Sequence, residues 1–245
     1  MSQEHAAPLP PPPLPPAQKV GAIIVAAGAS TRMGGVDKTL APLEGEPVLA
    51  RTVGVFEASP LVSAAVVLVA QHNLTAVVDV ARAHAWRTVR HVRLGGVRRQ
   101  DSVGLGLKAL PPECQWVIVQ DGARPLLTER LLEAGLRAAQ DTGAAVAAVP
   151  SADTIKRVSD DGRVLETLDR RSLALVQTPQ VFRRDVLERV HREVAEDATD
   201  DAAMCERLGI EVRVFLGDAA NLKITTPTDL VVAAALWRAR AGEGA

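Results

Sequence analysis

Aromatic residues are scarce in this sequence: they make up 2% of its 245 residues, and tyrosine is absent. Valine, leucine, isoleucine and alanine must therefore fill the interior. Hydrophobic residues account for 47% of the chain, which is enough to bury a substantial core and excludes disorder of the whole chain. The net charge of −1 gives no sign of the basic face that nucleic-acid-binding proteins carry, so we expect no nucleic-acid partner.

Cysteines and long apolar runs are also few. The two cysteines, Cys114 and Cys205, lie far apart in the sequence and lack the spacing of metal ligands, so we interpret them as reduced, structural thiols. No segment approaches the ~20 apolar residues that a membrane-spanning helix needs. The N-terminus has no basic region followed by an apolar run, as a signal peptide would. We therefore expect a cytoplasmic protein without a membrane partner.

Proline is concentrated at the N-terminus, where seven of the nine residues from Pro8 to Pro16 are proline. Such a segment has few backbone N–H donors and favours an extended polyproline II conformation. We predict that residues 1–18 form a disordered tail; a docking peptide for a proline-binding partner is the alternative. The folded domain is expected over residues 19–245.

Apolar runs typical of buried strands alternate with segments of helical periodicity over the rest of the chain. Strands are predicted at residues 20–26, 65–70, 89–94, 116–120, 144–149 and 212–216. Helices are predicted at residues 47–58, 74–86, 100–110, 128–141, 185–195, 200–208 and 228–241. This alternation predicts an α/β fold, a single Rossmann-like domain with a mostly parallel central sheet flanked by helices.

Residues 150–181 break the alternation. Two short segments of mixed polar and apolar residues, 154–158 and 164–168, flank the turn sequence Ser-Asp-Asp-Gly at residues 159–162, which predicts a β-hairpin. Neither strand has enough apolar surface to pack by itself. We therefore expect a projecting β-arm, at about residues 151–176, that packs against another surface, with a second copy of the chain as one candidate.

A loop of small residues, from Ala26 to Lys38, follows the first predicted strand. Ligands bind at the carboxyl ends of strands in open α/β sheets, and small side chains allow backbone N–H groups to approach a phosphate chain. Arg32 and Lys38 add two positive charges. The loop is neither a Walker A motif nor a dinucleotide-binding fingerprint. A tight turn would explain Gly28 but not the two cations, so we interpret the loop as a phosphate-binding site.

Three further segments place charged residues near the ends of predicted strands. They are residues 95–103, which begin with two glycines; residues 119–125, which contain Asp121; and residues 221–230, which contain Lys223. A single Asp at the end of a strand is more often a surface cap than a metal ligand. One acid and several cations around one anion-binding loop, however, suit Mg²⁺-assisted attack on a nucleotide phosphate, where charge stabilisation and positioning supply most of the catalysis.

The phosphate loop resembles that of the sugar-nucleotidyltransferase superfamily, which includes molybdenum-cofactor guanylyltransferases, through its Arg-Met-Gly and Asp-Lys pattern. Six further motifs occur in the order seen in the 2-C-methyl-D-erythritol 4-phosphate cytidylyltransferase family of the non-mevalonate isoprenoid pathway, and the match extends from about residue 20 to residue 236. These motifs are Gly95-Gly96 with Asp101-Ser102-Val103, Asp121-Gly122-Ala123-Arg124-Pro125, Asp153-Thr154-Ile155-Lys156-Arg157, Asp169-Arg170, Thr178-Pro179-Gln180 and Lys223.

The resemblance implies an enzyme that transfers CMP from CTP to a sugar-alcohol phosphate and releases pyrophosphate. The substrate phosphate is the nucleophile, so no Ser or Cys nucleophile is needed. The residues that the resemblance assigns to CTP are Ala26, Ala27 and Gly28 along the nucleotide, Gly96, Val97 and Ser102 at the cytosine edge, and Gly122 near the ribose. It further implies that Arg32 and Lys38 stabilise the charge that grows on the α-phosphate, and that Asp121 holds Mg²⁺.

The resemblance also implies a site for the sugar-alcohol phosphate and a second subunit. The residues assigned to this substrate are Arg124, Thr154, Arg170, Thr178 and Lys223, of which Lys223 is also assigned to catalysis. The hairpin residues would reach across a homodimer interface. Three positions depart from the family pattern. Ser30 stands where Gly is frequent. Val97 stands where an Asp is often found, so any base contact there must come from the backbone. Ala220 stands where an acid is common, which leaves open whether Asp218 assists the metal.

Three alternatives remain at this point. A ribitol-5-phosphate cytidylyltransferase would share the nucleotide site and differ in the pocket for the sugar alcohol. A guanylyltransferase would contain no counterpart of the hairpin or of the Thr178-Pro179-Gln180 segment. A nucleotide-binding regulator without turnover would not need Arg32, Lys38, Asp121 and Lys223 together.

Overall fold

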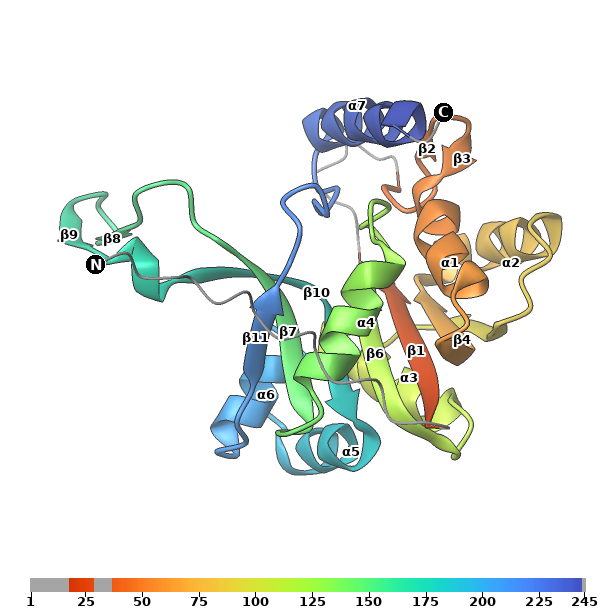
Figure 1. The fold of residues 1–245 in the computed structure, drawn as a ribbon, viewed down its shortest axis with the longest axis horizontal. Coiled ribbons are helices and arrows are strands. Elements are labelled where there is room, and N and C mark those ends of the chain that lie inside the picture. Colours follow the sequence, from red (N-terminus) through yellow and green to blue (C-terminus); the bar gives the residue numbers. More distant parts are fainter. Residues whose placement is uncertain (1–17, 29–36, 244–245) are drawn as a thin grey trace, which may run out of the picture.

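A seven-stranded sheet forms the centre of the protein, which a computed structural model describes over residues 18–28 and 37–243 (Figure 1). The strand order is β11-β7-β10-β6-β1-β4-β5. Neighbouring strands run parallel except at β10, which is antiparallel to both β6 and β7, so the prediction of a mostly parallel sheet is confirmed. The strands are β1 (Lys19–Ala26), β4 (Val62–Val69), β5 (Val89–Leu94), β6 (Cys114–Asp121), β7 (Ala144–Pro150), β10 (Ala174–Arg183) and β11 (Arg213–Leu216).

Helices cover both faces of the sheet, as the alternating pattern predicted. One face packs against α1 (Val48–Ala58), α2 (Leu74–Ala83) and α4 (Glu129–Ala138), which bury side chains such as Phe56 and Leu132. The other face packs against α3 (Arg99–Ala109), α5 (Arg184–Glu193) and α6 (Asp201–Arg207). A one-turn helix, η2 (Gln71–Asn73), precedes α2. The layers therefore form the flanked sheet of a Rossmann-like domain.

The last helix, α7 (Pro227–Glu243), lies beyond one end of the sheet (Figure 1). It packs near a small hairpin of β2 (Pro42–Leu43) and β3 (Glu46–Pro47). Leu43 of β2, Ala233 of α7 and Ile224 in the loop before α7 belong to a separate apolar cluster. None of the described helices combines the length and apolar character that a bilayer crossing requires. Both cysteines are buried and free, and burial raises the pKa of the Cys205 thiol to about 12, as expected for structural thiols.

The sequence pattern did not reveal β10, although this strand lies between β6 and β7 in the middle of the sheet. Its central residues, Gln177, Thr178 and Gln180, are polar but buried, so the strand lacks the apolar run that marks its neighbours. Its pairing with β7 is also interrupted between Val176 and Gln180. The buried polar side chains are bonded to loops instead: Gln177 to the backbone of Asp218, and Gln180 to the side chain of Asp200.

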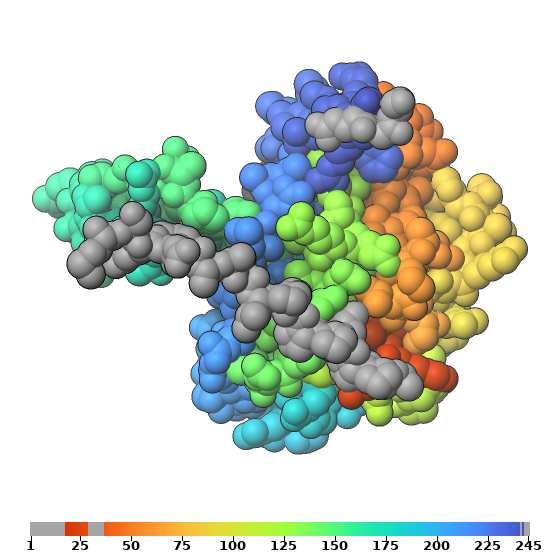
Figure 2. Space-filling model, in the orientation of Figure 1, coloured from red at the N-terminus to blue at the C-terminus, as the bar shows by residue number. Residues whose placement is uncertain are grey.

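The predicted hairpin consists of β8 (Lys156–Val158) and β9 (Val164–Thr167), which within residues 18–28 and 37–243 pair only with each other. Every residue of both strands is exposed. A one-turn helix, η3 (Arg170–Ser172), connects β9 to β10. The arm extends away from the body of the protein (Figures 1 and 2). The predicted N-terminal tail, residues 1–18, lies outside the described residues except for Gln18, and the division into tail and domain stays a prediction.

Close packing of α3 on the sheet leads to a first prediction. Replacing Gly106 by Ala should destabilise the protein by about 1–3 kcal/mol, because overpacking of a tight core costs that much. The added Cβ would lie 2.6 Å from Ile23 Cγ2 and 3.0 Å from Leu68 Cδ2. Urea unfolding measures the effect.

Gly104→Ala on the same helix is the matched control. Its Cβ would meet only His191 Nδ1, at an ordinary 3.5 Å. Helix propensity should therefore stabilise this variant by up to ~1 kcal/mol. Equal effects of the two substitutions would mean that α3 is not tightly packed at Gly106.

Candidate functional site

A cavity of about 270 Å³ lies at the carboxyl ends of β1 and β6, beside the start of α3. It brings together nine of the residues that the sequence predicted for the site: Ala26, Ala27, Gly28, Lys38, Gly96, Val97, Ser102, Asp121 and Lys223. A larger groove of about 940 Å³ lies between α3 and α5 but contains none of the predicted site residues. The smaller cavity is therefore the candidate active site.

The first wall of the cavity is the start of the predicted phosphate loop. Ala26 is the last residue of β1, and residues 29–36, including Arg32, lie outside the described residues. The chain is described again from Asp37, whose carboxylate accepts hydrogen bonds from the backbone N–H of Thr39, at 2.7 Å, and from Asn73 Nδ2, at 2.6 Å. These contacts fix the backbone that presents Lys38 at the cavity.

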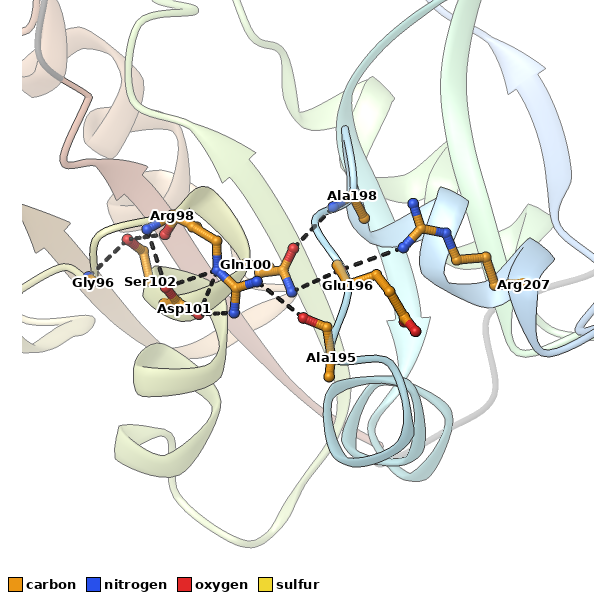
Figure 3. A network of polar contacts seen from close by, with 9 residues as sticks. All are labelled: Gly96, Arg98, Gln100, Asp101, Ser102, Ala195, Glu196, Ala198 and Arg207. Atoms are coloured by element: carbon orange, nitrogen blue, oxygen red, sulfur yellow. Dashed lines mark hydrogen bonds and ion pairs between the residues drawn. The ribbon is translucent and has the colours of Figure 1, made fainter.

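The second wall is the turn before α3. The N–H of Gly96 donates to Ser102 Oγ at 3.0 Å, and the Ser102 hydroxyl donates to the carbonyl of Arg98 at 3.2 Å (Figure 3). The turn also lies close to the first wall, because a Cβ at Gly95 would be only 2.4 Å from the Cβ of Ala27. Val97 is fully exposed, which agrees with the expectation that only its backbone faces a base.

The end of β6 carries the buried carboxylate of Asp121. Lys223 Nζ lies 3.0 Å and Arg124 Nε 3.3 Å from the same oxygen, Oδ2. Burial by itself would raise the pKa of Asp121, but the charges of Lys223, Arg99 and Arg124 hold that pKa below its usual value. Asp121 is therefore ionised at neutral pH. Asp121 is therefore not a solvent-exposed cap at the end of its strand, which was the alternative interpretation of the sequence.

Arg124 and Thr178 do not line the cavity. They stabilise the segment that carries Asp121. Thr178 Oγ1 accepts the backbone N–H of Asp121 at 3.0 Å. Asn221 Nδ2 donates to the Thr178 carbonyl at 2.8 Å, and Arg124 Nη1 donates to the Asn221 carbonyl at 2.7 Å. These bonds connect β6, β10 and the loop before α7, so they fix the relative positions of Asp121 and Lys223. Direct contact of Arg124 or Thr178 with a substrate stays a prediction.

Gly122 does not line the cavity either, although it is needed beside it. Its N–H donates to the Val25 carbonyl at 2.8 Å, and its carbonyl accepts Thr52 Oγ1 at 3.1 Å. A Cβ here would lie 3.0 Å from Ala26 Cβ and from Leu49 Cδ1. The absence of a side chain lets β6 end close to the first wall. The next residue, Ala123, lines the cavity.

Thr154 and Arg170 belong to the arm and lie outside the cavity. Both are exposed, and Arg170 Nη1 donates to the Ala152 carbonyl at 2.6 Å. Asp218, the possible second acid, accepts the Arg240 guanidinium at 3.0 Å and the N–H of Ala220 at 2.8 Å. It does not line the cavity.

Sequence reasoning missed five residues of the cavity wall: Val25, Thr39, Arg98, Arg99 and Ala123. The two adjacent arginines before a predicted helix were the available signal. At the start of α3, the Asp101 carboxylate accepts the backbone N–H of Arg98 at 3.1 Å and pairs with the Arg98 guanidinium at 2.7 Å. Arg99 pairs with the fully buried Asp201 at 2.5 Å. Nothing in the sequence near Arg99 indicates this partner.

Comparisons with known proteins agree with this geometry. The family described as "IspD: 2-C-methyl-D-erythritol 4-phosphate cytidylyltransferase" matches residues 20–239. A relative of that name from Dehalococcoides mccartyi is 49% identical over 221 residues, covering 90% of this chain and 97% of the relative. Another from Symbiobacterium thermophilum is 48% identical over 221 residues, covering 87% and 91%.

Solved structures give the same result. The 4-diphosphocytidyl-2C-methyl-D-erythritol synthase of Anaerococcus prevotii superposes with a TM-score of 0.80 at 27% identity, covering 90% of this chain and 96% of that one. The 2-C-methyl-D-erythritol 4-phosphate cytidylyltransferase of Thermus thermophilus superposes with a TM-score of 0.71 at 31% identity, covering 90% and 100%. The chain therefore belongs to the 2-C-methyl-D-erythritol 4-phosphate cytidylyltransferase family.

Proposed function

We propose that this chain transfers CMP from CTP to 2-C-methyl-D-erythritol 4-phosphate and releases pyrophosphate. The observation that carries the proposal is the cavity in which the ionised Asp121 lies with Lys38 and Lys223 beside a loop of small residues. One buried acid among cations suits a triphosphate and a divalent cation better than a neutral ligand. Family membership supplies the identity of the two substrates.

In this reaction an oxygen of the substrate phosphate attacks the α-phosphorus of CTP. The new P–O bond forms as the bond to the bridging β-phosphate oxygen breaks, and pyrophosphate leaves with that electron pair. The protein contributes positioning and charge stabilisation. Lys38 lies at the cavity and, with Arg32, would stabilise the charge on the α-phosphate; Lys223 would orient the attacking phosphate.

Mg²⁺ is the cofactor that we propose for this site. Among the described residues, no three His, Cys, Asp or Glu side chains form a metal cage. Mg²⁺ in nucleotide enzymes usually needs only one or two carboxylates together with substrate phosphates, so a single ionised Asp121 fits it. Lys223 and Arg124 both contact Oδ2 of Asp121, and the Asp121 carboxylate would hold the ion. When bound, the ion would neutralise charge on the triphosphate.

We further propose that the protein is a homodimer with shared active sites. The arm presents apolar side chains that the described part of its own subunit leaves at least half exposed: Val158, Val164, Leu165 and Leu175. A two-fold partner would bury them reciprocally. Arg170 at the base of the arm carries a guanidinium suited to bidentate contact with a phosphate. We place it in the substrate pocket of the neighbouring subunit.

A pyrophosphate-release assay tests the activity. We expect turnover with CTP and 2-C-methyl-D-erythritol 4-phosphate, and a lower kcat/KM with ribitol 5-phosphate. GTP should be at least ~10²-fold poorer than CTP, since a narrow turn around Gly96 rejects purines. Equal rates with GTP would revive the guanylyltransferase, and preference for ribitol 5-phosphate would favour the other cytidylyltransferase. Absence of turnover, with CTP still bound, would indicate a regulator.

The turn before α3 gives a prediction about base recognition. Ser102→Ala removes the acceptor of the partly buried Gly96 N–H, and leaving such a donor unsatisfied costs about 1 kcal/mol. We expect the KM for CTP to rise roughly tenfold with a smaller change in kcat. Ser63→Ala is the matched control, since Ser63 Oγ donates to the Val20 carbonyl at the other end of β1. An unchanged KM for CTP in Ser102→Ala would remove this turn from base recognition.

Complementation tests the shared site. Lys38→Ala and Arg170→Ala should each depress kcat by roughly 10²-fold, the effect of removing one charge-stabilising group. Mixed dimers of the two variants would contain one intact site and should recover about half of the wild-type activity per dimer. Arg171→Ala is the control, because Arg171 pairs with Asp169 and is exposed. No recovery despite subunit exchange would mean that Arg170 serves its own subunit.

A further inference from the structure

A buried acid outside the cavity holds one of the cavity's arginines. Asp201 is the first residue of α6, and its side chain is 0% exposed. Its Oδ2 lies 2.5 Å from Arg99 Nη1, and its Oδ1 lies 2.8 Å from His191 Nε2. Burial by itself would raise the pKa of Asp201, but the Arg99 charge and the hydrogen bond with His191 hold that pKa below its usual value, so the acid is ionised. Arg99, by contrast, lines the nucleotide cavity.

The segment that carries Asp201 is also bonded to both neighbours of Arg99. Arg98 Nη1 donates to the Ala195 carbonyl at 3.0 Å (Figure 3). Gln100 Nε2 donates to the Glu196 carbonyl at 3.2 Å, and Gln100 Oε1 accepts the N–H of Ala198 at 3.0 Å (Figure 3). Three consecutive residues at the start of α3 are thus attached to residues 195–201, which makes a fixed orientation of the Arg99 side chain possible.

Arg99 lies between two buried acids. Its charge lowers the pKa of Asp121 as well as that of Asp201, and both acids in turn raise the pKa of Arg99 against the effect of its burial. Its guanidinium is in contact with Asp201 and only within electrostatic reach of Asp121. Without Asp201, the remaining acid that could neutralise Arg99 at this site is Asp121 or the nearby Asp200. Asp200 is already bonded to Gln180 and to the N–H of Ala203.

We propose that Asp201, supported by His191, is a positioning residue that holds Arg99 at the wall of the nucleotide cavity and away from Asp121. Asp121 then keeps an oxygen for the divalent cation while Arg99 adds positive charge beside the nucleotide. This inference rests on the proposed role of Asp121 in binding the metal. Neutralising Asp201 frees Arg99 to pair with Asp121, so the guanidinium competes with the metal ion for the same carboxylate.

The experiment compares Asp201→Asn with the full-length wild-type protein. Mn²⁺ binding in the presence of CTP, without the second substrate, is measured by electron paramagnetic resonance. We expect Mn²⁺ affinity to fall about tenfold, the usual effect of losing a group that orients a metal site. Turnover should need correspondingly more Mg²⁺, while saturating Mg²⁺ restores much of kcat. Asp200→Asn is the matched control: it neutralises the adjacent acid, which does not contact Arg99, and should leave Mn²⁺ affinity near the wild-type value.

A double variant distinguishes a positioning role of Asp201 from a role in folding. In Arg99→Gln/Asp201→Asn no guanidinium is left to compete, so Mn²⁺ affinity should return to that of Arg99→Gln alone. Asp201→Glu should recover part of the loss because it restores the charge. A double variant that binds Mn²⁺ as weakly as Asp201→Asn, or an Asp201→Asn protein with wild-type affinity, overturns the proposal.

If Asp201→Asn fails to fold, as its melting curve would show, His191→Gln is measured in its place. It should weaken Mn²⁺ binding in the same direction but less, and adding Arg99→Gln should abolish the difference; no effect would overturn the proposal. Mn²⁺ binding to the wild type with CTP but without turnover would refute the proposed function and leave the binding comparison valid.

Discussion

The ionised carboxylate of Asp121, buried at the end of β6, is the constraint on which the rest of the site depends. A buried charge is costly unless cations and hydrogen bonds compensate for it. Here the compensation comes from three parts of the chain: Lys223 before α7, Arg99 at the start of α3, and Arg124 in the loop after β6. The ends of these elements must therefore meet at one point, and the cavity is the space that remains between them.

The local part of the fold could be predicted from the sequence. Runs such as residues 20–26 and 116–120 are apolar on both faces, and only a strand covered on both sides of a sheet accommodates them. β10 could not be predicted in this way. Its buried Gln177, Thr178 and Gln180 are stabilised by loops and by a distant helix start, and a pattern of neighbouring residues contains no information about such partners.

The site residues that the sequence predicted and those that it missed differ in the same way. Residues that belong to recognisable motifs, such as Gly96, Ser102 and Asp121, were placed at the cavity by the sequence. Arg99 was missed because its partner Asp201 is 102 positions away. Arg124 and Thr178 were found, but their contacts with Asn221 and Asp121 became visible only in three dimensions. Sequence motifs therefore identified the residues near the chemistry better than the residues that orient them.

The arm and the active site share one strand. β10 leaves η3 at Ala174 and reaches Thr178, whose hydroxyl accepts the N–H of Asp121, four residues later. At about 3.4 Å per residue, roughly 14 Å of backbone separates the start of β10 from Thr178, which is bonded to Asp121. β10 pairs with β7 at residues 174–176 and with both β7 and β6 from Gln180 on, so Thr178 lies in the interruption between the two paired stretches. The arm and the Asp121 carboxylate are therefore joined through one short segment of a single strand.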